Sequence, residues 1–229
     1  MKKQTRNKGL EVEIGVTKLK ADHKGGKLKF IYPIKGPNTY FNIRERILES
    51  NSRTPTLSEN ASLVYSAWQN PKEKYSKEIR DILRNNWLWC FNGILYEPKE
   101  GAYIQDNPEI KDNQVIINKS DLVKKLESND SSVRFVPFGY KTGEQTSEQL
   151  ANNKLVQALA TPEGAEKLAE VSSKYKNNPH VWGFDKVDQK LVRVASLSSG
   201  RDLGGRLYVD SYSDVVGGCG CALGVSEAS

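Results

Sequence analysis

The chain has 229 residues, of which 37% are hydrophobic and 27% are charged, a balance typical of a soluble globular protein. No uncharged apolar run approaches the ~20 residues that cross a bilayer, and the basic N-terminus is not followed by the apolar segment of a secretory signal. Three cysteines are too few for a disulfide framework. The sequence therefore predicts a cytoplasmic protein with no membrane partner.

The excess positive charge lies at one end of the chain. The formal net charge is +6, yet residues 1–36 contain ten Lys or Arg and only three Asp or Glu, whereas the rest contains 24 basic and 25 acidic residues. A local basic surface attracts phosphate groups, while a diffuse one mainly keeps a protein in solution. The position of the charge therefore indicates the N-terminal segment as a candidate binding surface.

The N-terminal segment predicts a flexible tail followed by a β-hairpin. Residues 1–9 are charged and nearly free of apolar side chains. The stretch LEVEIGVTK then alternates between apolar and polar residues, and the alternation resumes after ADHKGG with Leu28, Phe30 and Tyr32 in phase. Period-two alternation on both sides of a Gly-Gly turn indicates a hairpin with one buried face. Pro33 lacks an N–H group, so the second strand should be an edge strand there.

The middle of the chain predicts helices and a buried strand. A helix should run from Asn38 or Thr39 to about residue 49, a second should follow the capping box that starts at Thr56, and a third should begin at Ser76. The stretch WLWCFNGILYEP is apolar on both faces, which is typical of a strand inside a sheet. A return strand AYIQD, a short strand VIIN, a helix capped by Ser120 and the strand VRFVPFGY follow.

The last third predicts two further helices and four strands. Helices should begin at the capping box of Thr146 and at Thr161-Pro162, and the strands should be HVWGF, KLVRVASL, GRLYVDSY and CGCALGV. We therefore expect an α+β fold with an N-terminal β-hairpin, a helical middle, and a mixed or antiparallel sheet completed by the C-terminal strands. Residues 10–229 form a single domain, or two lobes that divide near residues 141–145.

Two cysteines near the C-terminus, Cys219 and Cys221, have three possible roles: metal binding, redox chemistry or simple packing. Cys90 and His180 would complete a four-ligand zinc set, but each lacks the close partner that marks a zinc motif. Small neighbours, Gly218, Gly220 and Ala222, would instead let another element approach closely. We therefore expect both thiols to be buried packing groups, and we predict no metal and no cofactor.

Other polar groups give weaker signals. The loop from Ser198 to Arg206 is rich in glycine and could form an anion-binding nest, but it matches neither a P-loop nor a dinucleotide fingerprint. The paired carboxylates fall near predicted turns, where solvated side chains are the rule: Glu97 with Glu100, Asp106, and Asp210 with Asp214. The three aromatic residues of WLWCF are expected in the core.

The leading functional hypothesis is non-enzymatic binding of nucleic acid or an acidic partner by the basic hairpin. The lysines that would carry it are Lys18, Lys20, Lys24, Lys27, Lys29 and Lys35. The alternative is a solvated edge that resists aggregation, because lysines on edge strands block pairing between sheets.

Two other classes of function stay open. An enzyme or a protein that binds a small anion or ligand would have its site in the C-terminal lobe, built from His180, Arg193, Arg201 and Arg206. A structural or assembly protein would expose a large apolar patch instead. The sequence leaves the ligand, any reaction, the partner and the oligomeric state undetermined.

Overall fold

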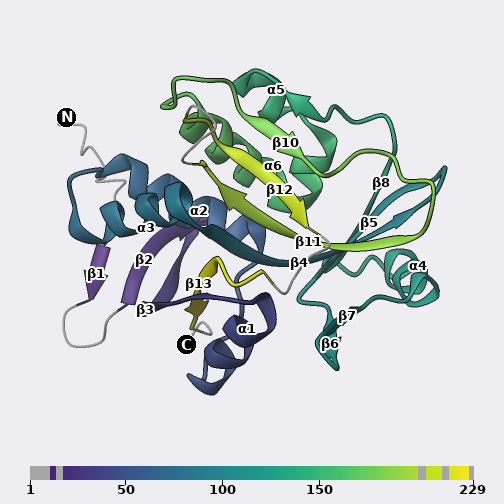
Figure 1. Ribbon diagram of the computed structural model, residues 1–229, viewed down its shortest axis with the longest axis horizontal. Helices are drawn as coiled ribbons and strands as arrows, with labels where there is room; N and C mark the ends of the chain where they lie inside the picture. Colours follow the sequence, from purple (N-terminus) through teal and green to yellow (C-terminus); the bar gives the residue numbers. More distant parts are fainter. Residues whose placement is uncertain (1–10, 14–17, 201–204, 213–216, 227–229) are drawn as a thin grey trace.

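The computed structural model describes residues 11–13, 18–200, 205–212 and 217–226, the side chains of residues 11–13 excepted. The protein has the expected α+β fold, in which helices pack on a large mixed sheet (Figure 1). Within the described residues this sheet has 11 strands, and β6 (Glu109–Lys111) and β7 (Gln114–Ile116) form a separate hairpin. The large sheet comprises β1 (Glu11–Glu13), β2 (Lys18–His23), β3 (Gly26–Asn38), β4 (Trp87–Glu97), β5 (Gly101–Asp106), β8 (Val133–Pro137), β9 (Gly143–Glu144), β10 (His180–Trp182), β11 (Leu191–Ser198), β12 (Tyr208–Tyr212) and β13 (Gly220–Val225).

The sheet is organised around the long strand β4. The strand order is β1-β2-β3-β13-β4-β11-β12-β10-β9, and β5 pairs with both β4 and β8. The first residues of β4 pair with β13 and its last six pair with β5, while β11 runs along its other edge. Two pairings, β13 with β4 and β10 with β12, are parallel and the others are antiparallel. The apolar sequence of β4 is explained by this position, because both of its faces are covered.

The N-terminal hairpin is present, and β1, β2 and β3 form consecutive antiparallel neighbours. Its β2–β3 turn is at Lys24 and Gly25, so the residues ADH of the predicted connection ADHKGG belong to strand β2. Among the described residues β2 pairs with β3 only as far as Ile31, and β13 then pairs with β3 on its other side. Pro33 therefore lies where β3 has a single described neighbour, which agrees with the expected local edge.

Six helices are found in the described part of the chain. They are α1 (Tyr40–Glu49), α2 (Leu57–Gln69), α3 (Lys74–Asn85), α4 (Lys119–Glu127), α5 (Ser147–Ala151) and α6 (Lys154–Ser172). The predicted caps of α1, α2 and α5 are confirmed, because Thr39, Thr56 and Thr146 precede these helices. The expected starts at Ser76 and Ser120 are wrong: α3 is preceded by Glu73 and α4 by Asn118, whose side chain accepts a hydrogen bond from the Ser120 amide.

The helix that the sequence predicts to start at Thr161 is the second half of a longer segment, α6. The segment α6 begins at Lys154, and Thr161 interrupts it with φ 66° and ψ 163°, immediately before Pro162. Proline cannot donate to the preceding turn, so the axis bends there and Thr161 acts as a new cap. Its Oγ1 accepts a long hydrogen bond from the amide of Gly164.

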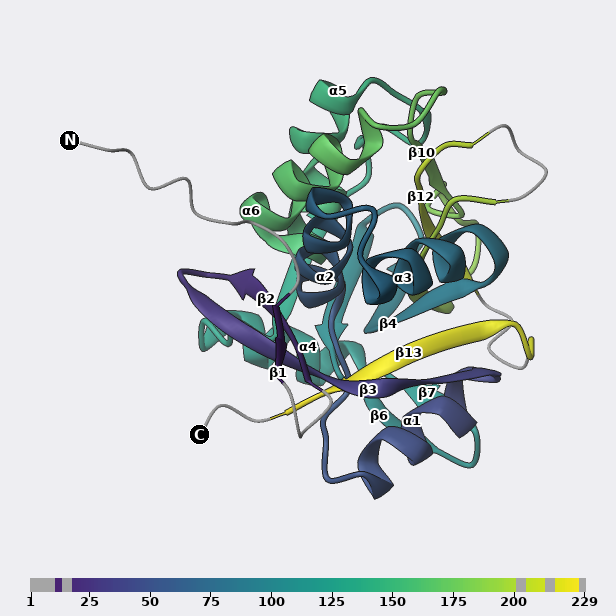
Figure 2. The same ribbon diagram turned by 90° about the vertical axis from the view of Figure 1, so that its left-hand side faces the viewer.

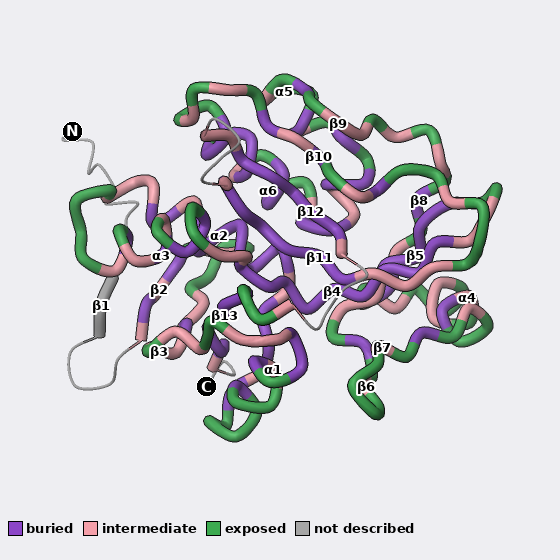
Figure 3. Tube along the Cα trace, in the orientation of Figure 1, coloured by how far each residue is buried: buried purple, intermediate pink, exposed green. Residues whose placement is uncertain are grey.

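The helices divide the two faces of the sheet unequally. The main core fills the space between the sheet and α2, α3 and α6, and α1 packs on the opposite face over β3, β13 and part of β4 (Figure 2). The central strands are buried along most of their length (Figure 3). No helix in the described ranges is both long and apolar enough to cross a membrane. The part of the second face formed by β10, β11 and β12 lies beyond α1 and forms the site described below.

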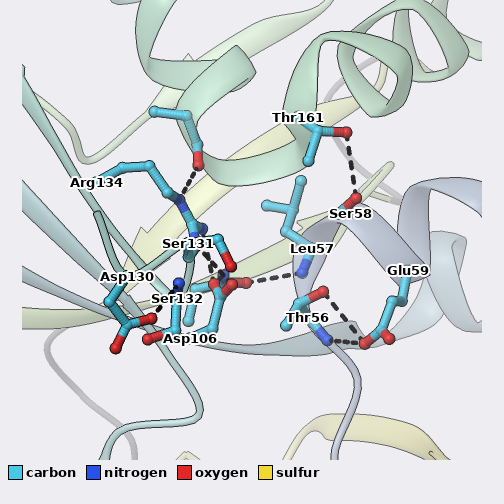
Figure 4. Close-up of polar contacts among 12 residues, drawn as sticks. Thr56, Leu57, Ser58, Glu59, Asp106, Asp130, Ser131, Ser132, Arg134 and Thr161 are labelled. Atoms are coloured by element: carbon cyan, nitrogen blue, oxygen red, sulfur yellow. Dashed lines mark hydrogen bonds and ion pairs between the residues drawn. The ribbon is translucent and has the colours of Figure 1, made fainter. Parts of the chain in front are cut away.

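A polar network fixes α2 and α6 to the sheet (Figure 4). The carboxylate of Asp106 accepts two hydrogen bonds from the Arg134 guanidinium, at 2.6 and 2.7 Å, and a third from the amide group of Asn92. Asn92 in turn accepts from the amide of Leu57, at the first turn of α2, and Arg134 Nε donates to the carbonyl of Ala158 in α6. Asp106 is therefore an anchor between elements, and it is not the solvated carboxylate that the sequence predicts.

Candidate ligand-binding site

One face of β10, β11 and β12 carries polar and aromatic side chains where the other face is apolar. Side chains alternate between the faces of a strand, and the register pairs His180 with Tyr208 and Trp182 with Asp210. The neighbouring strand β11 pairs Ser198 with Tyr208 and Ser196 with Asp210. The residues between them point into the main core, namely Val181, Leu197 and Val209. The alternating pattern therefore places the polar and aromatic side chains on the face that α2, α3 and α6 do not cover.

This face forms the floor of a cavity of about 690 Å³. The end of α3 and the start of β4 line one part of it, and Cys219, immediately before β13, lines another. The residues that line the cavity are Arg84, Asn85, Asn86, Trp87, His180, Trp182, Ser198, Gly200, Arg206, Tyr208, Asp210, Tyr212 and Cys219. Its volume is in the range of ordinary small-molecule sites.

Five rings form two aromatic groups in this cavity. Trp87 lies 4.5 Å from Tyr212, measured between ring centroids, with the rings tilted by 36°. His180 lies 5.7 Å from Trp182 and 5.6 Å from Tyr208. Trp182 is 56% exposed, an unusual amount for so large an apolar side chain. Both groups contribute flat ring surfaces to the lining of the cavity.

Asp210 lies between these aromatic groups, since Tyr208 and Tyr212 flank it in β12. Its side chain is 2% exposed, and Ser198 Oγ donates a hydrogen bond of 2.8 Å to its Oδ2. Burial raises the pKa of Asp210 to about 7, and the bond from Ser198 offsets only part of this shift. A carboxyl group that titrates near neutral pH can accept a hydrogen bond from a ligand, or exchange a proton with one.

His180 and Arg206, two of the sequence candidates, meet in this cavity. Burial, and secondarily the positive charge of Arg206, lower the pKa of His180, so its imidazole is mainly neutral at pH 7. Its Nδ1 is buried and has no hydrogen-bond partner within the described part of the chain. Arg206 forms an ion pair of 2.6 Å with Glu144, which lowers the pKa of that carboxyl and offsets the charge of the arginine.

Two further buried polar atoms lack partners among the described residues next to this floor. They are Ser196 Oγ and Trp89 Nε1, and the register places Ser196 between Asp210 on one side and Trp89 on the other. Buried polar groups are normally hydrogen-bonded. Unpaired groups beside a buried carboxyl indicate a polar floor under an aromatic cavity.

The C-terminal cysteines differ from each other. Cys221 is buried in the core, as expected, and its burial raises the pKa of its thiol to about 11. Cys219 is exposed at the cavity, so the expectation that both thiols are packed is wrong for Cys219. The strand β13 begins only at Gly220, so Cys219 lies in the preceding turn, outside the core.

The small residues around these cysteines do permit a close approach. A Cβ atom on Gly220 would overlap the indole nitrogen of Trp89, so this position requires glycine for space. Cys90 is fully buried on the helix-covered face, and no group of three or more Cys, His, Asp or Glu side chains in the described ranges is arranged to hold a metal. Cys219 and His180 line the same cavity, but Cys90 and Cys221 lie in the core, so the described residues do not bring the four together as a metal site.

The other candidate ligand residues lie elsewhere. Arg193 donates to the carbonyl of Gly183 and lies over the ring of Tyr96, 5.7 Å from its centroid, and it does not line the cavity. Arg201 and Asp214 fall outside the described residues. Asp210 itself lies in a strand and is buried, which corrects the expectation of a solvated carboxylate on a turn.

Two more predicted carboxylates, Glu97 and Glu100, are held by lysines. Lys119 contacts Glu100 at 2.6 Å and Glu97 at 3.9 Å, while Lys190 contacts Glu97 at 3.5 Å. Carboxylates neutralised in this way near the surface serve as ion-pair partners. This pair is remote from the cavity lining.

The hairpin lysines lie apart from the cavity. Lys24 and Lys27 are exposed at the β2–β3 turn, and Lys18, Lys20, Lys29 and Lys35 are partly exposed. The backbone register pairs Glu13 with Lys18 and Glu11 with Lys20. Binding of nucleic acid or an acidic partner by these lysines stays a prediction.

Sequence reasoning missed most of the cavity. His180 was the one ring among the sequence candidates. The predicted strands also contain Asp210, Ser198 and the other four rings of the cavity, but their common face depends on the parallel pairing of β10 with β12. The available signal was the alternation of YVDSY, which places Tyr208, Asp210 and Tyr212 on one side of a strand. Because alternate residues of a strand share a face, this pattern places a carboxylate between two tyrosines on one face.

Comparisons with protein-family models, with curated proteins and with solved structures find no match to this chain. The geometry of the cavity therefore carries the functional argument by itself.

Proposed function

We propose that this protein binds a small molecule with a planar heteroaromatic ring in the cavity bounded by β4, β10, β11 and β12. The observation that carries this proposal is that five rings from three strands and one buried carboxyl group, Asp210, line the same cavity of about 690 Å³. Concave, mostly apolar sites with a few convergent polar groups are the usual form of a small-molecule site.

The lining indicates which features of a ligand are recognised. Aromatic faces favour a flat ring through stacking and edge contacts. Asp210 and the hydroxyl of Ser198 offer an acceptor and a polar contact at the floor, which favours a ring that carries N–H groups. A purely hydrocarbon ligand would leave the carboxyl group buried without a new partner, at a cost in binding free energy.

Calorimetric titration with a panel of flat compounds tests the proposal. Suitable probes are adenosine, guanosine, cytidine, uridine, riboflavin and indole, and quenching of tryptophan fluorescence gives a second readout. At least one heteroaromatic probe should bind with a Kd below about 100 µM, and Trp182→Ala and Asp210→Asn should each weaken it about tenfold, equivalent to ~1.4 kcal/mol.

Phe135→Ala provides the control, because Phe135 is also an exposed aromatic residue but does not line the cavity. This variant should bind the probe as the unmodified chain does. The proposal is wrong if no probe in the panel binds, or if Phe135→Ala weakens binding as much as Trp182→Ala.

A second candidate function is the binding of nucleic acid or an acidic partner by the basic hairpin. Exposure of Lys24 and Lys27 at the β2–β3 turn favours it, because cations there are accessible to a phosphate backbone. The three free cysteines support the cytoplasmic location expected in either case.

A further inference from the structure

A second, smaller recess adjoins the aromatic cavity. It has a volume of about 200 Å³ and lies between the ends of α2, α3 and α6 and the loop after β11. Its lining consists of Trp68, Arg80, Arg84, Lys174, Tyr175, Lys176, Ser199, Gly200 and Gly205. Arg84 and Gly200 line both spaces, so the recess and the cavity meet at these two residues.

Among the described residues, the lining of this recess, which we call the basic recess, contains four cationic side chains and no carboxylate. None of these four residues, Arg80, Arg84, Lys174 and Lys176, forms an ion pair with a described residue. Arg206 at the neighbouring cavity is, by contrast, paired with Glu144. Cations that lie close together repel one another, and an anion in the recess would relieve this repulsion.

Arg80 is held in place for such a contact. Its guanidinium lies 4.2 Å from the centre of the Trp68 ring and donates to the carbonyl of Pro71 at 3.1 Å. Its Nε is buried and has no hydrogen-bond partner among the described residues. Arg84 and Tyr175 line the same recess. Burial raises the pKa of the Tyr175 phenol, and the positive charges of Arg80 and Arg84 offset part of this shift. An arginine fixed by stacking is pre-organised for a phosphate oxygen.

We propose that the ligand is a nucleotide, whose base occupies the aromatic cavity and whose phosphate groups occupy the basic recess. This inference rests on the proposed function, because the base is the planar ring of that proposal. A single carboxylate would need only one of the four cations, whereas a phosphate monoester or polyphosphate carries two or more negative charges. Arg84, at the junction, contacts the phosphate closest to the sugar.

The test compares each nucleoside of the panel with its own 5′-monophosphate and 5′-triphosphate by calorimetry, at low and at moderate salt. The nucleoside that binds should gain at least tenfold in affinity from its phosphates, and the gain should shrink at the higher salt concentration because ions screen exposed charges. Inorganic pyrophosphate, which lacks a base, should compete with the triphosphate.

The variant Lys174→Glu/Lys176→Glu tests the position of the phosphates. Both lysines are exposed, so the fold should persist, and thermal unfolding checks this. Triphosphate affinity should fall at least tenfold. The matched control is Lys154→Glu/Lys186→Glu, which changes the net charge equally at two exposed lysines outside both linings and should leave triphosphate affinity within about twofold.

The outcomes separate the two proposals. If nucleosides bind but phosphates add nothing, or if both charge-reversal variants lose affinity equally, the nucleotide inference is overturned while the aromatic site stands. The same holds if only riboflavin or indole binds. If only oligonucleotides bind, through the hairpin, no ligand occupies the cavity and both proposals fail. If no planar probe binds, the proposed function fails as well.

Discussion

Asp210 is a carboxyl group on the floor of an aromatic cavity, and its protonation should affect the stability of the protein. Burial raises its pKa to about 7 in the folded state from 3.8. Between these values the folded chain keeps a proton that the unfolded chain has released. The free energy of unfolding therefore falls as the pH rises through this range, and stays low above it.

Asp210→Asn removes this titration and keeps an oxygen that can accept the hydrogen bond from Ser198. Near pH 8 the variant should be more stable than the unmodified chain by up to ~4 kcal/mol, and near pH 5 the difference should fall to about 1.6 kcal/mol. Urea unfolding at both pH values measures it. Asp188→Asn, at an exposed carboxylate, is the control. A difference that does not change with pH would contradict the burial of an ionisable Asp210.

Cys219 offers a direct probe of the cavity, because the three thiols of the chain differ in environment. Cys90 and Cys221 are buried, and burial raises the pKa of their thiols to about 12 and about 11. Cys219 is exposed. Since the thiolate is the reactive form, one thiol per chain should react quickly with a maleimide under native conditions, and three should react after denaturation.

Cys219→Ser should abolish the fast reaction, whereas Cys221→Ser should leave it in place. A bound ligand in the cavity should slow labelling, since Cys219 belongs to the lining. Mass spectrometry of the labelled protein identifies the site. Fast labelling of Cys221 in the native chain would show that β13 is not packed as described.

At the scale of elements, the entry of the chain into β13 depends on Gly220. A side chain at this position would overlap the indole of Trp89, whose ring packs edge-on against Tyr40 of α1, with 5.5 Å between their centroids. Gly220→Ala should therefore displace Trp89 and lower the free energy of unfolding by about 3 kcal/mol, the upper part of the range for overpacked cores.

Gly218→Ala is the matched control, two residues away in the same glycine-rich stretch. A Cβ atom there would meet no atom within 4 Å, so stability should change by less than about 0.5 kcal/mol. Thermal unfolding and tryptophan fluorescence distinguish the two variants. Equal stability of the two variants would show that the Trp89 indole does not pack against Gly220 of β13.

At the scale of the whole molecule, we expect the hairpin to bind nucleic acid independently of ligand binding in the cavity. The hairpin turn is fixed to the body, because His23 Nδ1 lies 3.0 Å from Ser62 Oγ and Lys167 donates to the carbonyl of Asp22. Its cations therefore keep a fixed position relative to the helices. A fluorescent single-stranded RNA should bind at low salt and dissociate as salt increases.

Lys24→Glu/Lys27→Glu should weaken this RNA binding at least fivefold, whereas Trp182→Ala should leave it unchanged. Fluorescence anisotropy at two salt concentrations measures both. Absence of binding at low salt, or equal binding by the charge-reversal variant, would exclude the hairpin as a nucleic-acid surface. The cavity proposal does not depend on either result.

The elements themselves were largely predictable. Capping residues such as Thr56 and Thr146 act within a few residues of the helix that they start, and alternation within YVDSY acts within one strand. The starts of α3 and α4 were misplaced because several polar residues near each helix can serve as the cap, and tertiary packing selects among them. Ser76, for example, is fully buried inside α3.

The sequence by itself determined the α+β class, most helix starts, the C-terminal strands and the concentration of positive charge at one end, because these properties depend on neighbours along the chain. Tertiary structure alone decided that Trp87, His180 and Asp210 share a cavity, since they come from three strands far apart in sequence. Strand order and the unequal cover of the two sheet faces are set by packing over the whole molecule. For the same reason, the burial of Asp210 and the exposure of Cys219 could be read only from the folded chain.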